Sequence, residues 1–189
     1  WSFTVVNAAS TFGQGSETIT VVARDLAGNV SGSSSRTFTV DTVAPVAPTF
    51  ALATVLGVSS ANGLSNTGLV NVSGLEAGGS WQYTTNGGSS WSTGSGSSFS
   101  LATGSYAAGS IQVRQTDAAG NTSTVSSNAS SITVDATPPA SPTINAVATD
   151  NIVNASENSN LVISGTAEAG SSVTITGSSG YSTTATANG

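Results

Sequence analysis

The segment FTVDTVAPVAPTF, residues 38–50, recurs as ITVDATPPASPTI at residues 132–144. All five prolines of the chain lie inside these two segments. Proline fixes φ and has no N–H to donate to a neighbouring strand, so a cluster of prolines interrupts a sheet. The two segments are therefore predicted to be junctions between domains.

Two further motifs repeat at nearly the same spacing. ARDLAGNVS (23–31) recurs as QTDAAGNTS (115–123), and VSGLEAGGS (72–80) recurs as ISGTAEAGS (163–171). The three pairs keep their order along the chain. The acidic residues inside them are 92–94 residues apart, which matches the size of one immunoglobulin-like β-sandwich.

Short runs of alternating apolar and polar residues lie between the junctions, and 37% of the chain is hydrophobic. This pattern favours half-buried strands over disorder. We predict an all-β fold of tandem seven-stranded immunoglobulin-like β-sandwiches joined end to end. The expected divisions are the C-terminal half of a repeat at 1–41, a complete repeat at 42–135 and the N-terminal half of a repeat at 136–189.

The two half-repeats are expected to be complementary. Read from the end of the chain to its start, YSTTATANG followed by WSFTVV would form two strands around an Asn-Gly turn. The preferred interpretation is that the chain is one period of a longer array, divided inside a domain. The alternative is a subunit that a neighbouring copy completes with donated strands.

Charge is scarce and mostly negative. Only 6% of residues are charged, against about 25% in ordinary globular proteins, and the net charge is −6. Such a surface repels phosphate groups, so no nucleic-acid partner is expected. No apolar run approaches the ~18 residues that a membrane span needs, so no membrane insertion is expected. The chain has no His or Lys to activate its many serines, so it is expected not to be an enzyme.

Six of the nine acidic residues belong to the repeated motifs. Strands of a sandwich alternate in direction, which places the loops of Glu76 and Asp117 at the end where Asp41 enters. Asp41, Glu76 and Asp117 are therefore expected to meet at one junction. By the same reasoning Asp135, Glu168 and the Asp25 of an adjoining copy are expected to meet at the next.

Three carboxylates without a cation repel one another, which favours a bound metal at the junction. Calcium takes about six to eight oxygen ligands, and Asn29 and Asn121 would add amide oxygens. Asp150 and Glu157 are weaker candidates for a second site. The alternative is that Asp residues of these motifs only cap turns, as Asp does at the start of a DxAGN sequence.

The aromatic residues Trp81, Tyr83 and Trp91 lie on or beside the predicted hairpin that contains TTNGGSSW (84–91). The preferred interpretation is a rigid turn whose aromatic side chains pack on the sandwich. The alternative is an aromatic platform that binds a sugar ring.

The motifs DLAGNVS and DAAGNTS, VDTVAPVAPT and VDATPPASPT, and GTAEAGSSVTIT resemble bacterial Ig-like repeats. Repeats of this kind fill the central regions of large repetitive adhesins and biofilm-associated surface proteins. The resemblance covers essentially the whole chain. It implies export to the bacterial cell surface, calcium at many joints, and partners that are neighbouring repeats of the same chain or other copies.

The expected function is therefore a non-catalytic extender of a secreted or cell-surface adhesin, with junctions that calcium stiffens. The alternative is a self-assembling extracellular fibre or matrix subunit, a homopolymer of the chain. Edge strands are usually protected by charge, especially by Lys, and this chain has no Lys. A carbohydrate-binding module is a third interpretation, based only on the aromatic hairpin.

Overall fold

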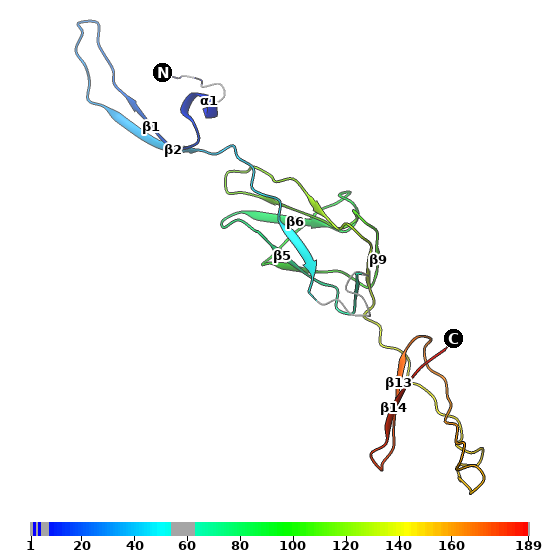
Figure 1. The fold of residues 1–189 in the computed structure, drawn as a ribbon. Coiled ribbons are helices and arrows are strands. Elements are labelled where there is room, and N and C mark those ends of the chain that lie inside the picture. Colours follow the sequence, from blue (N-terminus) through cyan, green and yellow to red (C-terminus); the bar gives the residue numbers. More distant parts are fainter. Residues whose placement is uncertain (1, 3, 5–7, 54–62, 189) are drawn as a thin grey trace. The chain divides into compact units, whose positions relative to one another are not determined.

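The structure is a computed structural model in which residues 2, 4, 8–53 and 63–188 are described. The chain divides into two compact units, Trp1–Ala136 and Thr137–Gly189. Regular structure in both units is almost entirely β, which confirms the all-β fold class (Figure 1). The predicted Asn-Gly turn lies outside the described residues, and the three-part division stays a prediction.

Three sheets surround one core in the middle of the first unit. The first sheet has the order β3 (Thr49–Leu52), β5 (Leu69–Ser73), β8 (Ser98–Ser100). The second has the order β11 (Ser126–Ser127), β10 (Gln112–Thr116), β6 (Ser80–Thr84), β7 (Ser92–Thr93). The third has the order β4 (Leu64–Ser65), β12 (Ile132–Val134), β9 (Gly104–Tyr106), and β4 runs parallel to β12.

The core follows the two-residue period of the strands. Along β5, Val70 and Val72 are buried while their neighbours are exposed. One cluster of buried apolar residues joins the three sheets: Val70, Val72, Trp81, Phe99, Leu101, Ile111, Val113 and Val134. Because β3, β5 and β8 face β6 and β10 across this cluster, the arrangement has the character of a β-sandwich.

A long antiparallel hairpin runs from β9 to β12. Its tip is the DAAGN turn at 117–121, and the bridge between Thr116 and Thr122 closes the ladder beside the tip. The register changes by one residue between the β9–β12 pair and the β10–β11 pair. The buried side chain of Asn128 lies at this change of register. Its Oδ1 accepts the Ile111 N–H at 2.9 Å, and its Nδ2 donates to the carbonyls of Ala107 and Ser130, both at 2.8 Å.

The N-terminal part of the first unit repeats this hairpin. β1 (Gly15–Val21) pairs with β2 (Ser34–Val40), and the DLAGN turn at 25–29 forms the tip. The short helix α1 (Ala8–Phe12) precedes β1, and the Phe12 ring contacts the Phe38 ring edge-on at 5.4 Å between centroids. Among the described residues, β1 pairs with β2 alone.

The second unit contains the hairpin of β13 (Ser172–Thr176) and β14 (Ser182–Thr186). Thr143 and Asn145 donate backbone hydrogen bonds to the carbonyls of Thr166 and Ser164, at 2.8 and 2.9 Å. Within the described part of the chain, no helix is long and apolar enough to span a membrane.

Candidate functional site at the repeat junction

The linker 41–48 connects β2 to β3 and carries the VDxxxP motif. It has no regular secondary structure, and Pro45 and Pro48 supply no N–H for a ladder. Pro48 is nevertheless fully buried. The linker is held by side chains that bind its backbone, and Gln14 Oε1 accepts the Thr42 N–H at 3.1 Å at its start.

Gln115 of β10 binds the middle of the linker. Its side chain is only 3% exposed. The Nε2 atom donates to the Val46 carbonyl at 2.6 Å and to the Gly74 carbonyl at 2.9 Å, and Oε1 accepts the Glu76 N–H at 2.8 Å. Both amide hydrogens and the amide oxygen thus have partners, and one side chain joins the linker to the loop that follows β5.

Two further side chains of the same hairpin bind the two ends of the linker. Asn121 Nδ2 donates to the Asp41 carbonyl at 3.2 Å. Ser126 Oγ donates to the Pro48 carbonyl. Gln115, Asn121 and Ser126 therefore hold the linker at its start, middle and end, and we call these three residues the linker clamp.

Asp117 orients Asn121 within the clamp. Its Oδ1 accepts the backbone N–H groups of Ala119 and Asn121 at 2.9 and 2.8 Å, and its Oδ2 accepts Asn121 Nδ2 at 2.9 Å. These bonds to the charged carboxylate, chiefly the one from the Asn121 side chain, hold the pKa of Asp117 below its ordinary value. They are the bonds that the turn-capping interpretation predicts.

The β1–β2 hairpin has the same bonds at its tip. Asp25 accepts the Asn29 N–H and the Asn29 Nδ2, both at 2.8 Å, and the Asn29 side chain likewise lowers the pKa of Asp25. The position equivalent to Gln115 holds Ala23, which has no amide. The turn is therefore repeated in both hairpins, while the central member of the linker clamp is present only in the complete sandwich.

Hydrogen bonds from Asn121 and Gln115 connect the hairpin of Asp117 to the backbone of Asp41 and of Glu76. The Asp41 carboxylate, however, accepts the Val43 N–H at 3.1 Å, and the Glu76 side chain is exposed. No three His, Cys, Asp or Glu residues in the described ranges form a group that could hold a metal ion. Calcium at this junction stays a prediction.

Of the other predicted metal ligands, Asp150 and Glu157 bind backbone N–H groups of their own loops. Asp150 Oδ1 accepts the Ile152 N–H at 2.9 Å, and Glu157 Oε2 accepts the Asn154 N–H at 3.1 Å. The backbone N–H of Asp135 donates to the Ser65 carbonyl at 2.9 Å, and Glu168 is exposed beside β13. The meeting of Asp135 and Glu168 with the Asp25 of another copy stays a prediction.

The aromatic residues do not lie side by side on an open face. Trp81 is buried and its Nε1 donates to the Gly96 carbonyl at 2.9 Å. Tyr83 stacks on Phe99 with ring centroids 4.2 Å apart. The Arg114 guanidinium lies 4.1 Å from the centre of the Trp91 ring. A sugar platform at this hairpin would therefore have Trp91 alone, with a cation on one of its faces.

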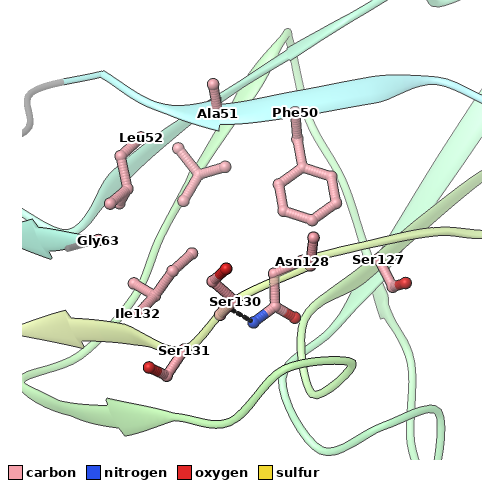
Figure 2. Close-up of a pocket in the computed structure, with 11 residues that line it drawn as sticks. Phe50, Ala51, Leu52, Gly63, Ser127, Asn128, Ser130, Ser131 and Ile132 are labelled. Atoms are coloured by element: carbon pink, nitrogen blue, oxygen red, sulfur yellow. Dashed lines mark hydrogen bonds between the residues drawn. The ribbon is translucent and has the colours of Figure 1, made fainter. Parts of the chain in front are cut away.

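A pocket of about 310 Å³ lies between β3 and the segment 127–132 (Figure 2). Phe50 and Leu52 of β3 lie on one side, and Asn128 and Ile132 lie opposite. The polar side chain at its floor, Asn128, already uses its donors and acceptor in the hairpin. Every buried side-chain nitrogen and oxygen of the described residues likewise has a hydrogen-bond partner. The other polar side chains that line the pocket are the hydroxyls of three exposed serines, Ser127, Ser130 and Ser131.

No protein-family model matches the chain, and a search of curated proteins found no match. The functional interpretation therefore depends on the internal repeat and on the geometry of the junction.

Proposed function

We propose that this chain is a non-catalytic extender segment of a secreted, cell-surface adhesin of bacteria, built from tandem immunoglobulin-like repeats. The single observation that carries the proposal is the linker clamp. A proline-containing linker whose carbonyls are bound by Gln115, Asn121 and Ser126 acts as a stiff joint, since each bond removes freedom from the connection between one repeat and the next.

The strand order supports the immunoglobulin-like part of this proposal. A three-stranded sheet, β3-β5-β8, faces a four-stranded sheet, β11-β10-β6-β7, across a single core. The short strand β4 pairs in parallel with β12, the last strand of the sandwich. Antiparallel sheets packed in two layers, with the first part of the chain shared between them, are typical of this fold.

Stiffness at the joint is directly measurable. The chain has no Cys, so nitroxide labels at Thr39→Cys and Thr93→Cys report only the distance between the β1–β2 hairpin and the sandwich. We expect a narrow distance distribution in double electron–electron resonance, and a much broader one after Gln115→Ala combined with Asn121→Ala. Gln112→Ala, on the same strand but outside the clamp, is the matched control and should leave the distribution narrow.

A broad distribution in the unsubstituted protein would refute the stiff joint. An unchanged distribution after the double substitution would remove the linker clamp as its cause. The measurement does not depend on the ligand at the distal tip, so it tests the extender proposal by itself.

The self-assembling fibre is the second candidate, and one observation favours it. Apolar side chains of the β1–β2 hairpin and of the second unit are exposed: Ile19, Val22, Ile144, Val162 and Tyr181 are 39%, 61%, 69%, 70% and 57% exposed. Apolar faces of this kind mark contact surfaces. Filaments whose mass rises with protein concentration, seen by electron microscopy, would support this candidate.

A further inference from the structure

The complete sandwich shows how a hairpin with a DxAGN tip is covered. Its strand β10 pairs with β6, and Val113 lies opposite Tyr83 while Arg114 lies opposite Gln82. Ile111 and Val113 are fully buried by this arrangement, at 0% exposure. The four-stranded sheet β11-β10-β6-β7 thus combines two hairpins, one from each half of the repeat.

The β1–β2 hairpin is the structural counterpart of the β10–β11 hairpin. The backbone bond from Ser31 to the Ala23 carbonyl (2.8 Å) matches the bond from Ser123 to the Gln115 carbonyl (2.9 Å). The Ala23 N–H donates to Ser31 Oγ, as the Gln115 N–H donates to Ser123 Oγ. The equivalence fixes an offset of 92 residues, which makes Val21 the counterpart of Val113.

The β13–β14 hairpin is likewise the counterpart of β6–β7. The Ser171 N–H donates to the Glu168 carbonyl at 3.0 Å, as the Gly79 N–H donates to the Glu76 carbonyl at 3.2 Å. The offset is again 92 residues, so that Ile175 is the counterpart of Tyr83. The strands that follow these two bonds, β13 and β6, both begin at a serine.

The two hairpins differ from their counterparts in burial. Ile19 is 39% exposed, whereas its counterpart Ile111 is at 0%. Val173 of β13 is half-buried, whereas its counterpart Trp81 belongs to the core. Among the described residues of 137–188 no side chain is buried, although the segment carries Ile144, Ile152 and Val162. Each half therefore exposes the face that the other half covers in the complete sandwich.

We propose that two copies of this chain join through these halves, with the segment 20–24 of one copy pairing antiparallel to β13 of the other. The register is that of β10 on β6, and it places Val21 opposite Ile175 and Val22 opposite Thr174. The inference depends on the repeat interpretation of the proposed function, and it adds the partner, the strands and their register.

The chemistry of the two edges fits this pairing. Val21, Ala23, Val173 and Ile175 would meet on the inner face, where apolar side chains gain most from burial. The strand β13 has no charged residue and the segment 20–24 has only Arg24. Neither edge carries the Lys or inward-pointing charge that blocks strand addition. No pair of residues in this register places two like charges across from each other.

Disulfide trapping between single-cysteine forms of the full 189-residue chain tests the register. Val22→Cys and Thr174→Cys change exposed side chains on the outer face. A 1:1 mixture of the two forms, one of them with a mass tag, is oxidised and analysed by non-reducing electrophoresis. We expect several-fold more heterodimer than from Val22→Cys mixed with Thr184→Cys.

Thr184 is the matched control because it pairs with Thr174 across the β13–β14 hairpin. It therefore lies one strand further from Val22, about 10 Å across the sheet, which is beyond disulfide reach. Ile19→Asp, on the inner face, should reduce the heterodimer several-fold, whereas Thr18→Asp, on the outer face, should not.

Equal heterodimer yields from the Thr174→Cys and Thr184→Cys mixtures would overturn the proposed register. If the double variant Val22→Cys, Thr174→Cys gives only a cyclised monomer, the second copy is wrong as the partner. Equal heterodimer yields together with a narrow distance distribution at the linker would refute the pairing and leave the extender proposal standing. The reverse result would refute the stiff joint and leave the pairing.

Discussion

Gln115 Nε2 donates a hydrogen bond of 2.6 Å to the carbonyl of Val46, a residue 69 positions earlier in the chain. The same amide binds Gly74 and Glu76, so that a single side chain fixes the linker to the sandwich that follows it. The junction is therefore held by polar bonds to the backbone of the linker, and the prolines keep that backbone free of competing ladder bonds.

Replacement of Gln115 by Ala should destabilise the first unit by about 1–3 kcal/mol, because a buried side chain and its three part-buried hydrogen bonds to the backbone would be lost. Urea unfolding followed by tryptophan fluorescence measures this change. Gln112→Ala is the control on the same strand, and its half-buried amide makes one bond, to the Gly109 carbonyl at 3.1 Å. Equal effects of the two substitutions would contradict the special role of Gln115.

Asn128→Ala should cost a similar amount, about 1–3 kcal/mol, since the buried Ile111 N–H is left without a partner and the Ala107 carbonyl keeps only the Ser110 N–H. Hydrogen exchange should then speed up in β10 and β12, on both sides of the shifted pairing. Asn71→Ala, at an exposed position of β5, is the control and should change stability by less than about 0.5 kcal/mol. If Asn128→Ala leaves the free energy of unfolding unchanged, the change of register in the hairpin does not need this side chain.

Acid should weaken the hairpin tips. The pKa of Asp117 is lowered in the folded state, mainly by the hydrogen bond from the Asn121 side chain. The folded state therefore binds fewer protons near the ordinary carboxyl pKa, and the stabilisation is present above that pKa of 3.8. It should be lost as the pH falls through the lower, folded value.

Asp117→Asn separates this titration from the turn itself, because the Asn side-chain oxygen still accepts the N–H groups of Ala119 and Asn121. The variant should show a smaller decrease in unfolding free energy below about pH 4 than the unsubstituted chain does. If the unfolding free energy of both proteins decreases equally at acid pH, the pH dependence comes from other carboxylates.

Calcium should raise the thermal midpoint of unfolding by several degrees if the junction carboxylates bind it. Binding only to the folded state at about 100 times the dissociation constant adds roughly 2.7 kcal/mol. Asp41→Ala or Glu76→Ala should abolish part of the increase measured between EDTA and millimolar calcium, and Glu17→Ala should not. If calcium leaves the midpoint unchanged, Asp41 and Asp117 act only as turn caps.

Features that depend on neighbouring residues could be predicted from the sequence. The alternation of apolar residues predicted strands, and the all-β class is confirmed. The DLAGN and DAAGN motifs gave turn capping by Asp25 and Asp117 as the alternative to metal binding, and capping needs only bonds inside one loop. An offset of 92 residues relates the two hairpin tips, and the two bonds from Asn29 to Asp25 match those from Asn121 to Asp117.

The tertiary structure alone decided which polar side chains hold the junction. Gln115 is not a repeated residue, since Ala23 occupies the equivalent place, so the internal repeat gave no reason to select it. Its partners lie 39 to 69 positions away, and no local pattern encodes such contacts. The burial of Trp81 and Tyr83 depends in the same way on Phe99 of a different sheet, because packing across two layers is a property of the assembled sandwich and not of any one strand.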